Sequence, residues 1–216
     1  MSDIAPPCGF YATTVKRWVD VALSIVLVPL LLPLLACVWI AVRIALGSPC
    51  LHVDERAGSH GRPFRLFKFR SMSDARGEDG HLLPDAARLD AFGRFLRRTS
   101  LDELPQLFNV LFGDMSLVGP RPLPLRYVPR YSSRQRSRLL VRPGLTGWAQ
   151  IHGRNDLDWP ARLELDVRYV EMLSRWYAPL VDLCILTATV FHVAWHAFSG
   201  RGVAARGSAT MTEFFP

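Results

Sequence analysis

The sequence lacks the short motifs that mark several large enzyme classes. It contains no GxxxxGK followed by Ser or Thr, no GxGxxG and no HExxH. The first of these motifs cradles nucleotide phosphates, the second positions a dinucleotide and the third holds zinc. Their absence argues against nucleotide hydrolysis on a P-loop and against hydride transfer from a nicotinamide cofactor.

Cysteine is scarce and has no metal-binding spacing. The four cysteines are Cys8, Cys37, Cys50 and Cys184, with no CxxC pair and no histidine at a zinc-finger distance. Two of them lie in apolar stretches, as reduced structural thiols often do. We therefore expect reduced thiols in a protein that faces a cytosolic compartment.

The balance of charge favours anionic partners. The 216 residues carry a formal net charge of +7, and half of them are hydrophobic, which suffices for one domain with a buried core plus a membrane element. Nucleic acid, anionic lipid and phosphorylated substrates all fit this charge. Charge alone does not choose among them.

Charge is missing altogether from residues 21–42, a run long enough to cross a bilayer core, which takes about 20 residues. Pro29 and Pro33 interrupt it, and each removes a backbone donor from a helix. Lys16 and Arg17 precede the run and Arg43 follows it, so the positive-inside rule places both ends in the cytoplasm. A bent, re-entrant helix satisfies these features, although a kinked spanning helix is the open alternative.

A second apolar stretch covers residues 178–198 and is broken by Asp182, His192 and His196. Such a segment is expected to lie in the membrane interface. A buried core helix is the alternative, because the length and hydrophobicity fit that too.

Between these stretches the composition becomes globular and rich in arginine. Residues 63–72, PFRLFKFRSM, alternate as a strand that places Lys68 and Arg70 on one face. The two cations either bind an anion together or form a solvated strand face.

Residues 88–98 form an amphipathic helical pattern that gathers Arg94, Arg97 and Arg98 at i, i+3 and i+4. The planar guanidinium group suits phosphate, since it donates two parallel hydrogen bonds. These arginines end just before Asp102 and Glu103, and neighbouring cations are expected to lower the pKa values of both carboxyl groups.

A second helical pattern has its apolar stripe at Leu104, Leu107, Phe108 and Leu111, and Gly113 is expected to end it. At its start, Ser100 and Glu103 read as a capping box, which would give the acids a purely structural role. Pro105 argues instead for a start nearer Asp102, because a proline is harmless only in the first turn. In either case a carboxylate stands where phosphate, metal and nucleophile can meet.

Two rigid loops supply further arginines. Arg121 lies between two prolines in residues 116–124. Arg142 and Arg154 lie near the two ends of the glycine-rich residues 142–156. These arginines either contact a diphosphate or are surface residues without a role. In the helix expected at residues 163–173, Glu164 and Arg168 form an i, i+4 pair, which leaves Asp166 to face a site or solvent.

With these segments in view, the chain resembles the bacterial sugar transferase family, the small monotopic phosphoglycosyl transferases that act on polyprenyl phosphate. The resemblance covers about residues 16–190. Its landmarks, in order, are KRWVD, FKFRSM, RLDAFGRFLRRTSLDELPQLFNVLFGDMSLVGPRP, RPGLTGWAQIHGRN and LELDVRYV. One departure is Leu32 before Pro33, where family members often have serine.

The resemblance implies that Asp102 is the nucleophile, that Glu103 helps to hold Mg²⁺, and that Arg97 belongs to the phosphate site. Arg121 and Arg154 match family arginines near the nucleotide sugar. Lys68, Arg70, Arg142 and Asp166 complete our set of substrate-binding candidates.

The expected fold is mainly α with a small β component, membrane-associated through one re-entrant (monotopic) N-terminal helix plus interfacial amphipathic helices. We divide the chain into a tail (1–15), the re-entrant helix (16–47), a cytoplasmic catalytic domain (48–176), and an interfacial helix with a C-terminal tail (177–216).

The expected function is transfer of a sugar 1-phosphate from a UDP-sugar to undecaprenyl or another polyprenyl phosphate at the cytoplasmic face of the bacterial inner membrane. The implied partners are these two substrates and membrane lipids, with no nucleic acid. One rival is a non-enzymatic membrane-anchored module that binds polyanions. A second is a glycosyltransferase that would release UDP instead of UMP.

Overall fold

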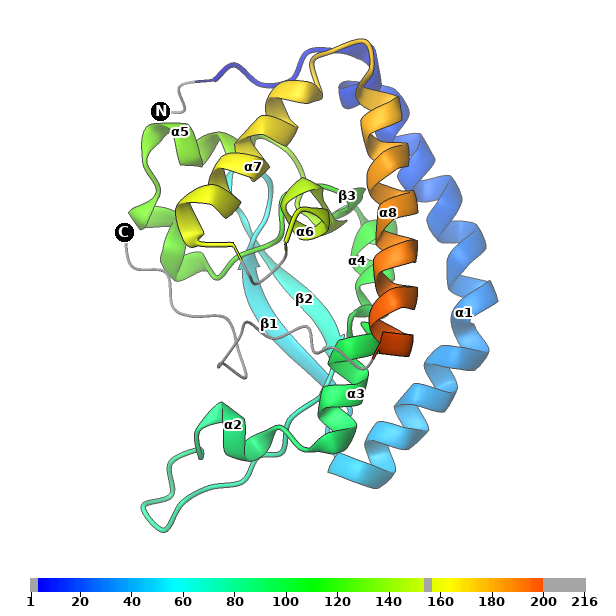
Figure 1. The fold of residues 1–216 in the computed structure, drawn as a ribbon, viewed down its shortest axis with the longest axis vertical. Helices are drawn as coiled ribbons and strands as arrows, with labels where there is room; N and C mark the ends of the chain where they lie inside the picture. Colours follow the sequence, from blue (N-terminus) through cyan, green and yellow to red (C-terminus); the bar gives the residue numbers. More distant parts are fainter. Residues whose placement is uncertain (1–3, 154–156, 200–216) are drawn as a thin grey trace.

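The computed structural model describes residues 4–153 and 157–199, and within them the chain is mainly helical with two small sheets (Figure 1). The α-helices are α1 (Lys16–Leu46), α2 (Asp85–Arg88), α3 (Ala91–Thr99), α4 (Gln106–Phe112), α5 (Ser133–Arg136), α6 (Trp148–Ile151), α7 (Trp159–Met172) and α8 (Ala178–Ser199). The strands are β1 (Leu51–Ala57), β2 (Pro63–Phe69), β3 (Ser116–Val118) and β4 (Gly144–Thr146). Short turns of other helix types are η1 (Tyr11–Val15), η2 (Ser59–Gly61), η3 (Leu101–Glu103), η4 (Leu125–Arg130) and η5 (Ser137–Leu140).

The N-terminal apolar run forms one continuous helix, α1, with Pro29 and Pro33 inside it. The prolines therefore do not end the helix, but α1 bows outward near its middle in Figure 1, away from α8. Much of its apolar surface is exposed, including the side chains of Ile25, Val26, Leu30, Trp39 and Ile44. An exposed surface of this kind is typical of a helix that contacts lipid.

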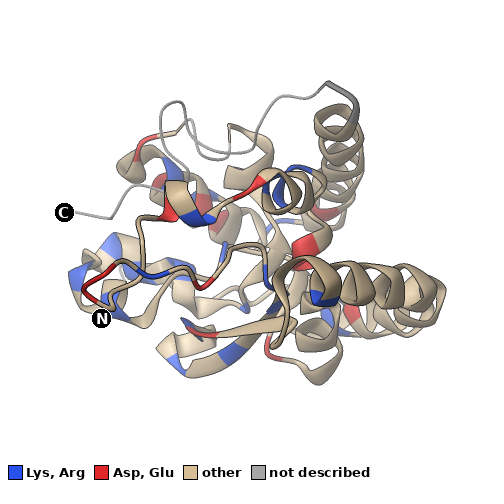
Figure 2. Cartoon of the chain, turned by 90° about the horizontal axis from the view of Figure 1, so that it is seen from below, with Lys and Arg blue, Asp and Glu red and all other residues tan. Residues whose placement is uncertain are grey.

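Both ends of α1 are attached to the globular part of the chain. Near its start, Arg17 donates to the carbonyl oxygens of Val110 and Leu111 at 2.6 and 3.0 Å. At its end, the carbonyl oxygen of Leu46 accepts a hydrogen bond from Arg70. The helix thus leaves the globular part and returns to it. In Figure 2 the helix that projects to the right is tan along most of its length, as expected for an apolar segment.

Helix α8 is anchored by the acid that interrupts its apolar sequence. Asp182 accepts hydrogen bonds from Tyr11 and Lys16 at 2.6 Å, and from Tyr169 at 2.7 Å. Ile185 is also buried, yet large apolar side chains such as Phe191 and Trp195 are exposed. A fully buried core helix is therefore ruled out for this segment. Together, Tyr11–Leu46 and Ala178–Ala197 are long and apolar enough to cross a membrane.

Strands β1 and β2 form an antiparallel hairpin in which Asp54 pairs with Leu66 and His52 with Lys68. Leu66 and Phe69 are buried, which fixes the face that β2 presents to the core. Strands β3 and β4 pair in parallel, and Gly119 and Gly144 make their close approach possible. A Cβ atom on Gly144 would lie 2.0 Å from the amide nitrogen of Gly119.

The main core joins α4, β3, α7 and α8. Its largest fully buried side chains are Val110, Met115, Val118, Tyr169 and Ile185. The C-terminal apolar helix is therefore part of the same core as α4, whereas Leu101 and Leu104, which flank the acidic pair, pack against a second core that includes α1.

Candidate active site

Helix α3 is held unusually close to the segment that follows β2. Asp90 begins the helix by accepting a hydrogen bond from the amide of Gly93 at 2.7 Å. A Cβ atom on Gly93 would lie 1.9 Å from the carbonyl oxygen of Ser71, so only glycine fits there. This approach lets Arg97 donate from Nε to the Ser71 hydroxyl at 3.0 Å. The helix expected at residues 88–98 is thus divided, with α2 ending at Arg88 and α3 beginning at Ala91.

The acidic pair lies in a tight turn between α3 and α4. Ser100 has φ 56° and ends α3 in the left-handed conformation, and its side chain makes no capping hydrogen bond. The capping box is therefore absent, and α4 begins only at Gln106, with Pro105 as its N-cap. Gly113 ends α4 as expected, with φ 98°. The turn leaves the Asp102 residue only 7 % exposed.

Glu103 is bound to the proline-flanked loop. Its Oε1 accepts from Nη2 of Arg121 at 2.7 Å, with both side chains partly exposed. Pro120 and Pro122 restrict the backbone on either side of Arg121, so a rigid loop carries the guanidinium group. Arg121 and Glu103 therefore belong to one charged cluster beside Asp102.

A buried ion pair supports this loop from below. Arg138 donates from Nη2 to Oδ2 of Asp166 at 2.8 Å, and both side chains are 2 % exposed. The same guanidinium group donates to the carbonyl oxygen of Arg121. Asp166 lines the cavity described below, in agreement with the expectation that it faces a site, but it is not free, because it neutralises Arg138. A charge buried this deeply requires a partner.

Burial, followed by the negative charge of Glu103, raises the pKa of the Asp102 carboxyl to about 7. The expectation that neighbouring cations lower it was wrong, since desolvation outweighs Lys68, Arg97 and Arg121. The pKa of Lys68 is lowered, first by burial and then by Arg56. Two like-charged carboxylates next to each other create a site that favours a cation or a proton.

A cavity of about 1430 Å³ opens beside the acidic pair. Charged residues on its wall include Arg56, Lys68, Arg97, Asp102, Glu103 and Arg121. Arg94 and Arg98 also line it, so the three arginines of α3 share one space as expected. A different part of the wall is apolar and comes from the two long apolar helices, through Leu23, Leu27, Leu31, Leu186, Val190 and Val193. The cavity therefore combines a charged surface suited to phosphate with an apolar surface suited to lipid.

Two expected site residues in the described part of the chain do not join this cluster. Arg70 follows the end of β2 and donates to the carbonyl oxygens of Leu46 and Pro49, so it fastens α1 instead of facing the cavity with Lys68. Arg142 donates to the carbonyl oxygen of Gly113 at 2.9 Å and caps the end of α4. Arg154 lies outside the described residues.

Sequence reasoning missed Arg56 and Arg138, which lie in segments without a motif. Arg56 stands on β1 at a position paired with Phe64, and it is brought to the cavity only by the hairpin. Arg138 becomes important through Asp166, 28 residues later. The signal for Arg138 in the sequence was Asp166, an acid in an amphipathic helix with no helical partner of its own.

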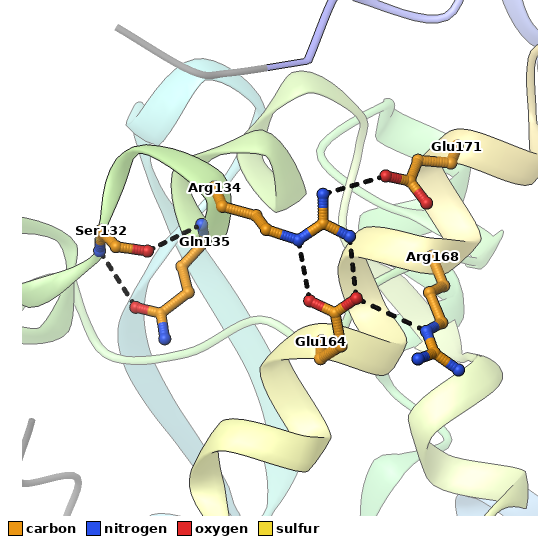
Figure 3. Close-up of polar contacts among 6 residues, drawn as sticks. All are labelled: Ser132, Arg134, Gln135, Glu164, Arg168 and Glu171. Atoms are coloured by element: carbon orange, nitrogen blue, oxygen red, sulfur yellow. Dashed lines mark hydrogen bonds and ion pairs between the residues drawn. The ribbon is translucent and has the colours of Figure 1, made fainter.

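The expected pair of Glu164 and Arg168 is present at 3.4 Å, but it belongs to a surface network (Figure 3). Arg134 joins this network through Glu164 at 2.7 Å and Glu171 at 3.1 Å. None of these side chains lines the cavity, and their partial exposure gives each pair a small effect on stability.

The acidic pair fits Mg²⁺ only if a substrate completes the coordination. Among residues 4–153 and 157–199, no cluster of three or more His, Cys, Asp or Glu side chains is placed to hold a metal. Mg²⁺ typically binds one or two carboxylates and takes its other ligands from water and substrate phosphates. Asp102 and Glu103 meet that requirement. Burial is the main cause of the raised pKa of Asp102, and the charge of Glu103 adds a repulsion that a cation would relieve.

The sequence profile of the family described as bacterial sugar transferase matches residues 11–196. An uncharacterized sugar transferase, EpsL, of Bacillus subtilis is 44 % identical over 196 residues, which cover 87 % of this chain and 96 % of that protein. The undecaprenyl-phosphate galactose phosphotransferase of Salmonella typhimurium is 39 % identical over 191 residues, with 81 % of this chain covered. The UDP-glucose:undecaprenyl-phosphate glucose-1-phosphate transferase of Escherichia coli is 38 % identical over 188 residues, with 82 % of this chain covered.

The chain spans 39 % of the length of the Salmonella and Escherichia coli relatives but nearly all of EpsL. The two long apolar helices, together with the family match, indicate association with a membrane. A non-enzymatic module that only binds polyanions does not fit these similarities. The cavity joins an acidic pair, arginines and apolar helices within the matched region, and the chain belongs to the bacterial sugar transferase family.

Proposed function

We propose that this chain transfers a sugar 1-phosphate from a UDP-sugar to undecaprenyl phosphate or a similar polyprenyl phosphate, at the cytoplasmic face of the bacterial inner membrane. The observation that carries the proposal is the shared cavity, which is lined by the buried Asp102, by arginines and by apolar side chains of α1 and α8. The names of the Salmonella and Escherichia coli relatives support the substrate classes.

In the first step, a carboxylate oxygen of Asp102 attacks the phosphorus atom that bears the sugar. The bond from that phosphorus to the bridging oxygen breaks, and UMP leaves with the bonding electrons. The sugar phosphate is then held on Asp102 as a mixed anhydride. In the second step, a phosphate oxygen of the polyprenyl phosphate attacks the same phosphorus, which frees Asp102 and yields a polyprenyl diphosphate sugar.

The described residues supply the charge that this attack requires. The approach of a carboxylate to a diphosphate is repulsive, and fixed cations reduce that repulsion without reorganising. Arg97 is oriented by Ser71, and Arg121 by its two flanking prolines and by Arg138. Lys68 adds a further positive charge close to Asp102.

Asp102 and Glu103 would hold Mg²⁺ together with diphosphate oxygens. When bound, the ion supplies charge neutralisation at the diphosphate and at the acidic pair. Glu103 is bound to Arg121 at 2.7 Å, so its carboxylate is already oriented at the edge of the cavity. With water and diphosphate oxygens as its other ligands, the ion requires no protein ligand besides Asp102 and Glu103.

The position of the cavity accounts for the membrane helices. A polyprenyl phosphate cannot leave the bilayer, whereas the nucleotide sugar is soluble, so the nucleophile has to stand at the interface. The leucines of α1 and the apolar residues of α8 on the cavity wall give the lipid a hydrophobic approach to Asp102. The return of α1 to the globular part is compatible with a helix that enters and leaves on one side.

The test is to incubate the purified chain with a panel of UDP-sugars, Mg²⁺ and undecaprenyl phosphate, and to measure released nucleotide. The proposal expects UMP and a lipid diphosphate sugar with at least one UDP-sugar. Release of UDP would indicate transfer of the sugar without its phosphate and would overturn it.

A further inference from the structure

The cavity has a second distinctive wall, made of aromatic rings and guanidinium groups. Tyr127 of η4 and Trp159 at the start of α7 both line the cavity, together with Arg126, Arg138 and Arg162. In Figure 1, the start of α7 lies on the left of the molecule, whereas α1 and α8 lie on the right. The aromatic residues therefore belong to a part of the wall that the lipid-facing helices do not provide.

Contacts on several sides fix the ring of Trp159 in place. Tyr127 packs edge-on against it, with the ring centroids 5.7 Å apart and the planes at 84°. The guanidinium group of Arg162 lies 4.8 Å from the Trp159 centroid. Tyr127 is only 4 % exposed, so it acts as a support, whereas Trp159 is partly exposed and faces the cavity. A rigid aromatic ring at the edge of a cavity needs little ordering when a flat ligand binds.

The surrounding charge favours a ligand that joins a flat ring to phosphate. Arg126 and Arg130 lie over Tyr127 at 5.4 and 5.9 Å from its centroid. The pKa of Arg162 is lowered, first by burial and then by the positive charge of Arg121, so an anion placed between these groups would be stabilised. Aromatic side chains and arginine planes are the usual stacking partners of nucleobases.

A chain of contacts links this wall to the acidic pair. Trp159 and Asp166 stand seven residues apart on α7, a rise of about 10 Å. Asp166 holds Arg138, which donates to the carbonyl oxygen of Arg121, and Arg121 is paired with Glu103 at 2.7 Å. Trp159 and the acidic pair therefore line the same cavity, at the two ends of this series of contacts.

We propose that Trp159, supported by Tyr127, stacks against the base of the nucleotide sugar and so forms the nucleobase subsite of the cavity. This inference rests on the proposed function, because it assumes a nucleotide donor. It assigns the donor to the aromatic wall and leaves the wall formed by α1 and α8 to the lipid.

The test uses the full chain in detergent and measures binding of UMP and of ribose 5-phosphate by calorimetry. Trp159→Leu should weaken UMP binding on the order of 10- to 100-fold, which corresponds to the loss of one base–aromatic stack. It should leave ribose 5-phosphate binding unchanged, because that probe has no base. Trp159→Phe should retain most of the UMP affinity. Trp176→Leu is the matched control, since Trp176 is 87 % exposed and does not line the cavity.

Equal UMP affinity in wild type and Trp159→Leu would overturn the inference, as would a wild type that binds UMP no better than ribose 5-phosphate. A defect with UDP-sugar but not with UMP would assign Trp159 to the sugar and would overturn it too. If Trp159→Leu does not fold, photo-crosslinking of 5-iodo-UMP to the wild type decides instead. The label should fall on Trp159 or Tyr127, and a label elsewhere contradicts the inference. UMP release from UDP-sugars is scored separately, so failure of the proposed function stays distinguishable.

Discussion

Glu103 and Arg121 stand 18 positions apart and meet in an ion pair of 2.7 Å at the edge of the cavity. The pair connects the tight turn between α3 and α4 to the loop after β3. The charges of Glu103 and Arg121 both act on the pKa of the neighbouring Asp102, the carboxyl group that we propose as nucleophile.

Replacing Glu103 separates a metal-binding role from a structural one. Glu103→Gln keeps the size of the side chain but removes the charge that a hard cation requires. We expect the transfer rate to fall on the order of 100-fold or more, which corresponds to a loss of several kcal/mol of charge stabilisation. The free energy of unfolding should change by less than about 1 kcal/mol, because the ion pair with Arg121 is partly exposed. The assay is UMP release over a magnesium titration.

Glu171→Gln is the matched control, because Glu171 pairs with Arg134 on the surface and does not line the cavity. It should retain wild-type activity. Wild-type rates for Glu103→Gln at low magnesium would rule out a metal-binding role for this residue.

The Asp166–Arg138 pair is predicted to position Arg121. Asp166→Asn leaves the buried Arg138 uncompensated and should lower the free energy of unfolding by roughly 3–5 kcal/mol. The double variant Asp166→Leu with Arg138→Met should recover stability, since no buried charge is left. It should not recover activity, because Arg138 no longer donates to the carbonyl oxygen of Arg121. Chemical denaturation and UMP release measure the two effects.

The surface pair of Arg134 and Glu164 in Figure 3 provides the comparison. Glu164→Gln should cost less than about 1 kcal/mol and leave the rate unchanged. If Asp166→Asn behaves like Glu164→Gln in both measurements, the positioning role is wrong.

The pH dependence follows from the raised pKa of Asp102, which is about 7. Only the carboxylate is nucleophilic, so the rate of the first step should rise with pH and level off above that value. Because a cation favours the charged form, increasing magnesium should move the midpoint of this profile to lower pH. A profile that stays flat from pH 5.5 to 8.5 at limiting magnesium would contradict the assignment.

The same shift affects stability. The folded state holds the Asp102 proton up to a higher pH than the unfolded chain does, so stability falls as pH rises from about 4 towards 7. Asp102→Asn does not ionise and escapes this loss. The inactive variant should therefore be more stable than wild type at pH 8, by roughly 4 kcal/mol, with the difference vanishing near pH 4. Thermal unfolding at the two pH values measures it.

The topology of α1 can be tested by cysteine labelling in a background without the native cysteines. Thr13→Cys reports on the segment before α1, and Trp176→Cys reports on the globular part. Both positions are exposed. A re-entrant helix predicts that an impermeant reagent labels neither in intact cells and both after permeabilisation. Labelling at position 13 alone in intact cells would mean that α1 spans the membrane.

Much of the site could be predicted from the sequence because its chemistry is concentrated in short local patterns. The acidic pair and the arginines of α3 lie within ten residues, from Arg94 to Glu103, so one turn brings them together. The roles of Arg70, Arg142 and Asp166 depended instead on contacts with distant backbone or side chains. No local pattern reports such contacts.

The same limit applied to the fold. Hydrophobic periodicity located α4 and α7 approximately, and Gly113 ended α4 as expected, but the helix expected at residues 88–98 is divided between α2 and α3. The capping box failed because Ser100 takes a left-handed conformation that closes α3 and leaves its hydroxyl group away from the next helix. The effect of burial on Asp102 was also beyond the sequence, since desolvation depends on packing around the completed cavity.

The central claim is that Asp102 carries the sugar phosphate, and mass spectrometry of the enzyme after brief exposure to UDP-sugar and Mg²⁺, without lipid, tests it most directly. The account predicts an added mass of one sugar phosphate less water on the peptide that contains Asp102, which disappears when undecaprenyl phosphate is added. Asp102→Asn, shown to be folded by its thermal unfolding, should carry no adduct and release no UMP. An adduct on a different residue, or transfer to lipid by the folded Asp102→Asn protein, would contradict the account.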